Sequence, residues 1–280
     1  MINELTQSSI GMFNRCGHQF YLRYIKGIII PPGIAARKGS SVHTGAEVNY
    51  RSRIENGKPA PLDVVQDATR DKYTELVNGE GVWLSDDELS EKSTLLTEGQ
   101  DQAIAMAAFY HLHMAPTDQE IALIEERLYA DLGVGIPVSG KPDVVADGKL
   151  IDLKTAGKRW PARKEEEQIQ PTVYRMLLRE NGFGELDPEY RIMTNMKRGP
   201  KETGNGVQYD PETGVCCDVR LAPRTQAHED ALKARIEAMM KAVNAGVFPP
   251  ADPGGWACSP KFCGYWGACP YVKGRIISTS

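Results

Sequence analysis

The sequence predicts an α/β fold in which helices flank a central mixed β-sheet. Residues 1–114 have mainly helical hydrophobic periodicity, whereas residues 115–250 combine β-rich segments with helices. No polar linker divides the 280-residue chain. We therefore expect one domain over residues 1–280, with a helical N-terminal elaboration, a core at 115–250 and a cysteine-rich tail at 251–280.

The N-terminal part is predicted to form a series of amphipathic helices. In the first, Ile10, Phe13 and Phe20 recur at roughly helical spacing, and Ser8 or Ser9 supplies an N-cap. The expected helices cover residues 8–25, 43–54, 67–77 and 87–114, with a loop at 33–41 and a linker at 59–65.

The middle of the chain holds the predicted strands. The expected β-rich segments cover residues 121–132, 141–155, 190–196 and 207–221, the last interrupted by a turn at 211–214. Two further helices are expected at 162–180 and 225–245, and Gly246 followed by Pro249 and Pro250 ends the second.

The charge and the apolar content limit the classes of function. The net charge is −4, so a surface that binds nucleic acid has to be a local patch or groove. The first ten residues lack the apolar stretch of a signal peptide, and no apolar run is long enough to span a membrane. We therefore expect a cytoplasmic protein, in the host cytoplasm if a phage encodes it, whose cysteines are free thiols or metal ligands.

A predicted hairpin carries the most informative polar residues. Asp147-Gly148 favours a two-residue type I′ turn, because both positions tolerate a positive φ. This turn pairs Ala146 with Lys149 and, three steps further, Asp143 with Asp152. Two carboxylates opposite one another repel, and a divalent cation with oxygen ligands would neutralise them.

Lys154 belongs to the same predicted site. It lies two residues beyond Asp152, so strand alternation places both side chains on one face of the sheet. Two acids and an ammonium group suit phosphodiester hydrolysis assisted by a metal ion. The alternative is a surface hairpin with solvated charges.

Together with residues outside the hairpin, this pattern resembles the PD-(D/E)XK nuclease superfamily and its RecB-like exonuclease branch. Pro142-Asp143 and Asp152-Leu153-Lys154 match the signature. The resemblance implies a restriction-endonuclease-like core, with His43, Asp143 and Asp152 as metal ligands and Lys154 as the catalytic lysine.

Two flanking motifs extend the resemblance. His43 ends the segment Gly39-Ser-Ser-Val-His43, and Gln170 and Tyr174 form a Gln-x-x-x-Tyr motif that supports the active site in the family. A spacing of four residues places Gln170 and Tyr174 on one helix face. Pro171 predicts that this helix is kinked or begins anew at this point.

Four cysteines resemble the ligands of the iron–sulfur nucleases, which include the AddB type and the CRISPR-adaptation exonucleases. They stand at both ends of the chain, at Cys16, Cys258, Cys263 and Cys269. The resemblance implies a [4Fe–4S] cluster that staples the tail to the first helix, and a four-cysteine zinc site is the alternative. Cys216 and Cys217 lie in a predicted strand and are expected to pack in the core.

The predicted function is a DNA exonuclease that uses Mg²⁺ or Mn²⁺ on single-stranded ends, in recombination, repair or phage DNA processing. Lys158, Arg159 and Trp160 follow the catalytic strand and suit a DNA strand, through phosphate contacts and base stacking. The sequence has no P-loop, so any helicase or recombination motor would be a separate protein. The alternatives are a structure-specific or nicking endonuclease, and an iron–sulfur or zinc DNA-binding subunit whose nuclease site is vestigial.

Overall fold

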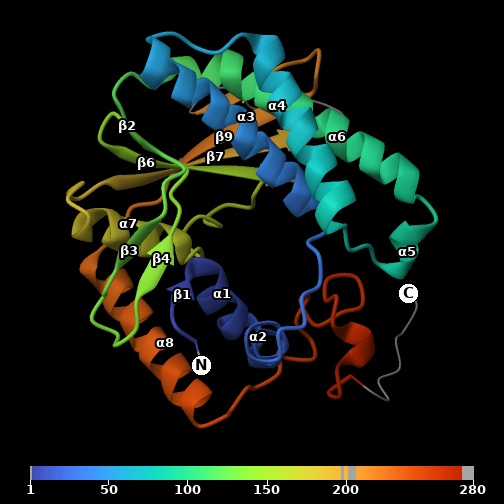
Figure 1. Ribbon diagram of the computed structural model, residues 1–280, viewed down its shortest axis with the longest axis vertical. Coiled ribbons are helices and arrows are strands. Elements are labelled where there is room, and N and C mark those ends of the chain that lie inside the picture. Colours follow the sequence, from blue (N-terminus) through green and yellow to red (C-terminus); the bar gives the residue numbers. More distant parts are fainter. Residues whose placement is uncertain (1, 197–198, 201–205, 273–280) are drawn as a thin grey trace.

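A six-stranded mixed sheet forms the centre of the computed structural model, which describes residues 2–196, 199–200 and 206–272 (Figure 1). Its order is β2-β5-β6-β7-β9-β8, and β6 and β7 are parallel whereas the other neighbours are antiparallel. A second sheet has the order β1-β4-β3. The strands are β1 (Leu5–Thr6), β2 (Ile121–Ile124), β3 (Leu128–Ala130), β4 (Val138–Gly140), β5 (Val144–Ala146), β6 (Lys149–Ala156), β7 (Asp187–Asn195), β8 (Val207–Tyr209) and β9 (Val215–Leu221).

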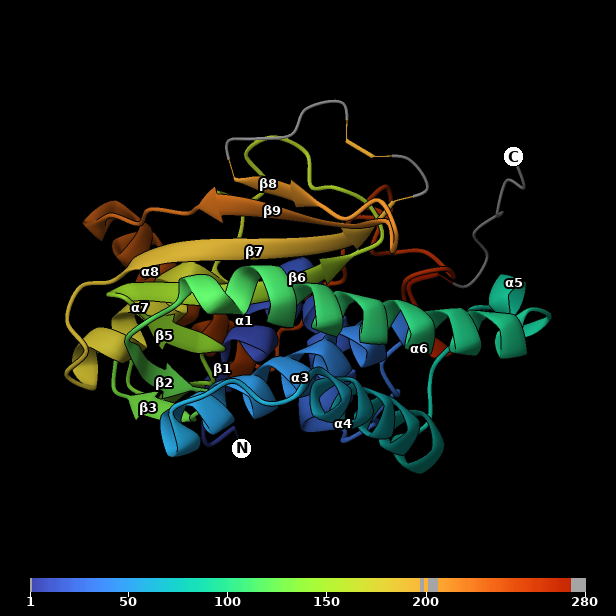
Figure 2. The same ribbon diagram turned by 90° about the horizontal axis from the view of Figure 1, so that it is seen from above.

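Helices cover both faces of the large sheet, as Figures 1 and 2 show. Leu150 of β6 packs in a core with α1, α7 and α8, whereas Ile151 and Leu153 pack in a second core with α3 and α6. The α-helices are α1 (Gln7–Arg15), α2 (Gly17–Phe20), α3 (Ile34–Asn56), α4 (Leu62–Glu75), α5 (Asp86–Leu89), α6 (Lys92–Phe109), α7 (Gln170–Glu180) and α8 (Gln226–Asn244). Single π-helical turns follow α2, α4 and α6, at Tyr21–Ile25, Leu76–Glu80 and Tyr110–Met114.

Four predicted segments were wrong in part. The expected loop at 33–41 is the start of α3, and the expected linker at 59–65 already contains the first turn of α4. The expected helix at 162–180 begins only at Gln170, with Pro171 in its first turn, where the missing N–H of proline needs no partner. The expected helix at 8–25 is divided at Cys16, whose backbone is extended between α1 and α2.

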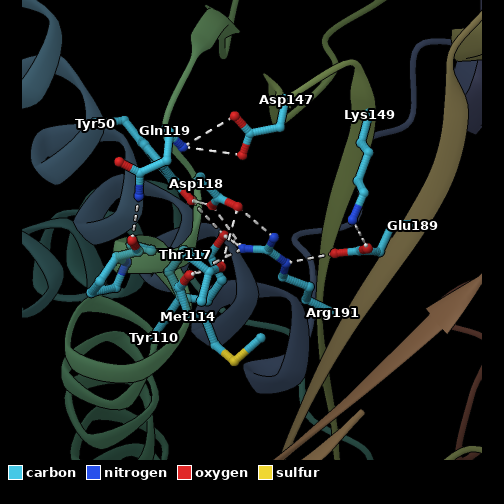
Figure 3. Close-up of polar contacts among 12 residues, drawn as sticks. Tyr50, Tyr110, Met114, Thr117, Asp118, Gln119, Asp147, Lys149, Glu189 and Arg191 are labelled. Atoms are coloured by element: carbon cyan, nitrogen blue, oxygen red, sulfur yellow. Dashed lines mark hydrogen bonds and ion pairs between the residues drawn. The ribbon is translucent and has the colours of Figure 1, made fainter. Parts of the chain in front are cut away.

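Helix α3 is anchored to the sheet by a buried polar network (Figure 3). Arg191 of β7 donates to both carboxylate oxygens of Asp118, over 2.6 and 2.8 Å. Tyr50 of α3 donates to Asp118 and lies 2.8 Å, between hydroxyl oxygens, from Tyr110. Strand β2 begins three residues after Asp118. The network therefore joins α3, β2 and β7, which all contribute to the site described below or lie next to it. We call Tyr50, Tyr110, Asp118 and Arg191 the Arg191 clamp.

None of the helices in the described part of the chain is long and apolar enough to cross a membrane.

Candidate active site

The predicted hairpin has the predicted register next to its turn, but the predicted pairing of Asp143 with Asp152 is not part of the ladder. Asp147 and Gly148 both have positive φ, at 51° and 70°, as a type I′ turn requires. Ala146 pairs with Lys149, and the ladder continues to Val144 and Ile151. It stops there, because the carboxylate of Asp143 itself accepts the backbone N–H of Leu153 over 2.7 Å. This bond fixes the Asp143 side chain and opens the hairpin at the site.

Asp152 and Lys154 project from the same face of β6 and form an ion pair. Asp152 is buried, and apart from Lys154, which lies at Oδ2, its carboxylate has no hydrogen-bond partner among the described residues. Burial raises the pKa of Asp152 to about 6. Burial lowers the pKa of Lys154, but the negative charges of Asp152 and Asp143 have the larger effect, so the pKa of Lys154 is raised. Lys154 is therefore a fixed positive charge.

His43 of α3 reaches the site with both ring nitrogens engaged. Nε2 lies 3.0 Å from the carbonyl oxygen of Leu153. Nδ1 lies 3.1 Å from Glu125 Oε1 and 3.3 Å from Asp143 Oδ1. Burial opposes protonation, but the two carboxylates outweigh it and raise the pKa of His43 to about 10. An imidazole that donates from Nε2 to a carbonyl presents Nδ1 to its ligand, which is the arrangement common to metal-binding histidines.

Glu125 completes this group and follows β2 directly. Its backbone has a positive φ of 46°, and its N–H donates to the carbonyl of Asp143 over 3.0 Å. The side chain lies between His43 and Lys141, whose Nζ is 2.7 Å from Glu125 Oε2. The structure thus places Glu125 at the site, whereas its neighbour Glu126 is exposed.

A divalent cation fits these residues. Within the described residues, His43, Glu125 and Asp143 offer ligand atoms that all lie within 4.8 Å of one another. Asp152, which was predicted as a ligand, pairs with Lys154 through Oδ2, and its Oδ1 has no partner among the described residues. One imidazole and several carboxylates suit Mg²⁺ or Mn²⁺.

An open cleft of about 430 Å³ gives access to the site. The start of α3 forms one wall, including Gly39, and β6 forms the other, including Thr155. A Cβ at Gly39 would lie 3.2 Å from the Thr155 hydroxyl, so the missing side chain lets the two walls approach closely. His43, Glu125, Lys141 and Lys154 line the cleft.

The Gln-x-x-x-Tyr motif lies beside the acids. Gln170 begins α7, and Tyr174 is one turn further on the same face. The Tyr174 hydroxyl interacts with the Gln170 side chain and the Lys141 backbone. Burial raises the pKa of Tyr174, and Asp143 and Asp152 raise it further. Tyr174 thus contacts the Lys141 segment that leads to Asp143, and Gln170 contacts Tyr174.

The three residues predicted to bind DNA differ in their surroundings. Lys158 is exposed. Arg159 donates to both oxygens of Asp218, over 2.7 and 3.0 Å, and Trp160 packs edge-on against Tyr190 with 5.1 Å between ring centroids. Arg159 and Trp160 therefore have structural partners in addition to any role at a DNA strand.

Cys16 lies where the tail meets the first helices. Its Sγ accepts the N–H of Gln19 and of Ala251, over 3.4 and 3.3 Å. A Cβ at Gly17 would lie 2.8 Å from the ring of Pro249, so this approach requires glycine.

The other three predicted cluster ligands lie in the tail. The pKa of Cys263 is raised by burial and also by the nearby thiols of Cys16, Cys269 and Cys258, against a backbone hydrogen bond that lowers it. Among the described residues, no three of these sulfur atoms lie within 4.8 Å of one another. The structure thus gives no support to a preassembled four-cysteine site. Cys216 and Cys217 are buried in β9, as predicted.

Acids, a histidine and a lysine arranged at a splayed hairpin of a mixed sheet are an arrangement that suits a nuclease. A family model for the PD-(D/E)XK nuclease superfamily matches residues 4–270. The chain belongs to this superfamily, and it is a nuclease by family. The fold predicted from the sequence, a central mixed sheet flanked by helices in a restriction-endonuclease-like core, is confirmed.

A solved structure supports the fold over most of the chain. It is described as a "putative exonuclease" from Eubacterium rectale and matches with a TM-score of 0.55 at 14% sequence identity. The match covers 91% of this chain and 87% of the other. No curated protein sequence matches this chain.

Proposed function

We propose that this protein is a DNA exonuclease that requires Mg²⁺ or Mn²⁺ and acts on single-stranded ends, in recombination, repair or phage DNA processing. The observation that carries the proposal is the approach of His43, Glu125 and Asp143 to within 4.8 Å, beside the buried pair of Asp152 and Lys154. The whole chain acts as one nuclease domain in a reducing, cytoplasmic setting.

Each residue has a distinct role in this proposal. His43, Asp143 and Asp152 hold the metal, with Glu125 as a fourth ligand. The backbone of Leu153 holds two of these ligands. Its N–H donates to Asp143, and its carbonyl oxygen contacts His43 Nε2. When bound, the cation supplies Lewis acidity toward the scissile phosphate and the attacking water.

Lys154 acts on charge rather than as a base, because its raised pKa keeps it protonated. Its ammonium group orients the water and stabilises the negative charge that grows on the phosphate. The water oxygen bonds to phosphorus and gives up one proton to solvent, the bond from phosphorus to the leaving oxygen breaks, and that oxygen takes up one proton from solvent, so that the protons balance. Gln170 and Tyr174 position the Lys141 segment, and Lys158, Arg159 and Trp160 border the DNA strand.

The first experiment is hydrolysis of end-labelled single-stranded DNA with Mn²⁺ or Mg²⁺, by wild type and by Asp152→Asn. We expect mononucleotides or short products from wild type, no products in the presence of a chelator, and no products from the variant. Circular single-stranded DNA tests the exonuclease assignment, because only an endonuclease cuts it. If wild type leaves linear DNA intact with either metal, the protein is a DNA-binding subunit with a vestigial site.

We further propose that Cys16, Cys258, Cys263 and Cys269 bind a [4Fe–4S] cluster. The support is the influence of the other three thiols on the pKa of Cys263 and the two N–H groups that point at Cys16 Sγ, since such bonds accompany cluster thiolates. A four-cysteine zinc site is the alternative. Anaerobically purified protein should be brown and contain iron and sulfide, whereas colourless protein with zinc contradicts the assignment.

A further inference from the structure

An exposed apolar segment precedes α3. Residues 24–29 are all exposed, and they include Tyr24, Ile25, Ile28 and Ile29. Ile29 keeps 70% of its surface accessible and Ile28 47%. Contiguous exposed apolar surface of this kind marks an interaction site rather than ordinary surface.

The C-terminal tail extends this surface. The Tyr265 hydroxyl donates to the carbonyl of Ile28 over 2.7 Å, and His18 packs edge-on against Tyr271 with 4.9 Å between ring centroids. Figure 1 shows the tail beside α2 and beside the segment that leads into α3. The tail adds exposed aromatic side chains to the apolar segment. We call the combined surface the aromatic patch; its members are Tyr24, Ile28, Ile29, Trp256, Phe262 and Tyr271.

Cations accompany the aromatic rings. Lys261 lies over the ring of Phe262 at 6.0 Å from its centroid, and Arg23 lies over Tyr24 at 5.8 Å. Lys26 lies over Tyr21, next to the patch, at 5.5 Å.

Acidic residues are absent from the two segments that form the patch. The sequence has no Asp or Glu from residue 5 to residue 46, nor after Asp252, although the whole chain has a net charge of −4. The two segments therefore carry basic but no acidic side chains, which suits a polyanionic ligand. The nearest acidic residues in the neighbouring segment are Glu80, Asp86 and Asp87, on either side of Trp83, which pairs with Gly33.

The patch is continuous with the active-site cleft. The segment that carries Ile28 and Ile29 enters α3 at Ile34, and Ala35 and Ala36 in the first turn line the cleft. A ligand on the patch would therefore reach the cleft along the start of α3, on the side where His43 lies.

From this geometry we infer that the aromatic patch binds the single-stranded DNA substrate outside the cleft. This inference rests on the proposed nuclease function and names the surface that selects single strands. Unpaired bases stack on exposed aromatic rings, while lysine and arginine contact the phosphates. A duplex keeps its bases stacked on one another and offers the rings no partner. The cations that accompany the rings favour a polyanionic strand over an uncharged apolar partner.

The test measures binding of fluorescent oligo(dT) by anisotropy, with Ca²⁺ in place of Mg²⁺ so that the DNA is not cut. Phe262→Ala and Tyr24→Ala should each weaken binding about tenfold. Charge reversal at the exposed lysines, Lys26→Glu with Lys261→Glu, should lower the salt dependence of log Kd by roughly 0.7 per lost phosphate contact. Tyr129→Ala is the matched control, because Tyr129 is an equally exposed aromatic residue on β3.

The outcomes separate the patch from the nuclease site. The patch inference is wrong if the wild type degrades single-stranded DNA but the patch variants bind oligo(dT) with the same affinity as Tyr129→Ala. A protein partner is then the better occupant of the patch. If the wild type itself does not degrade DNA with Mn²⁺, the proposed function fails independently of the patch. Thermal unfolding of each variant shows that it is folded, and the charge-reversal pair alters only side chains at the surface.

Discussion

Backbone groups of Leu153 hold the side chains of Asp143 and His43 at the site. Lys154 supplies the positive charge that we expect to matter most for catalysis. We predict that Lys154→Ala lowers kcat by about 10²- to 10³-fold, because the variant loses the positive charge that faces the phosphate. Lys149→Ala is a suitable control on the same strand, since Lys149 is half exposed and pairs with Glu189, away from the acids. The measurement is steady-state hydrolysis of labelled DNA. An equal loss of activity in both variants would contradict a specific role for Lys154.

Glu125 offers a second test at this scale. We predict that Glu125→Gln weakens Mn²⁺ binding by about 10- to 100-fold, because it removes a charged oxygen next to His43 and Asp143. Glu126→Gln is the matched control, because its side chain is exposed. Isothermal titration with Mn²⁺ measures both. Unchanged affinity in Glu125→Gln would exclude this carboxylate from the metal site.

The sequence could identify some of these residues but not all of them. Asp143, Asp152 and Lys154 follow from the Asp-Gly turn and strand alternation, both of which are local rules. Glu125 does not, because its positive φ breaks the alternation of β2 just where the choice between Glu125 and Glu126 has to be made. The ion pair of Arg159 with Asp218 could not be predicted from the sequence either, because 59 positions separate the two residues.

At the level of elements, the position of α3 depends on the Arg191 clamp. His43 and Tyr50 are seven residues apart and therefore lie on the same side of α3. Tyr50 is held by Asp118, and β2, which leads to Glu125, begins three residues after Asp118. The clamp thus orients two elements that each supply one candidate metal ligand.

This arrangement predicts a large effect on stability from a residue outside the cleft. Asp118→Ala leaves Arg191 buried without its bidentate partner and should lower the free energy of unfolding by about 3–5 kcal/mol. Arg51→Ala, which breaks an exposed ion pair on α3, should cost less than about 1 kcal/mol. Urea denaturation compares the two variants. Similar midpoints would show that the clamp does not anchor α3.

The start of α3 shows why a predicted loop became a helix. Residues 33–41 are rich in Gly and Ser, which have low helix propensity and suggested a loop. The structure uses small residues there for close packing, as at Gly39 against Thr155, and again at Gly45, where a Cβ would lie 2.3 Å from the Thr69 hydroxyl oxygen. Tertiary packing therefore outweighs local propensity, and a single sequence cannot reveal this.

At the scale of the whole molecule, the C-terminal tail packs against the first helices of the chain. The tail after α8 returns to α1 and α2, where Ala251 donates to Cys16, across a loop of 235 residues. The sequence predicted this return only through the cysteines at both ends, because the tail has little regular structure. Its aromatic residues pack on residues 18–30, and no periodic pattern could have predicted these contacts.

A cluster at the cysteines would make the tail part of the folded unit, because the free energy of ligation contributes to the free energy of folding. We predict that Cys263→Ala loses iron and exposes the tail, so that trypsin cuts after Lys261 much faster than in wild type. Cys217→Ala is the control, since Cys217 is buried in β9 and should affect packing but not iron content. Iron analysis and timed proteolysis under anaerobic conditions measure both effects. If Cys263→Ala keeps its iron, or if wild type and variant are cut at the same rate, the tail is held by its aromatic contacts alone.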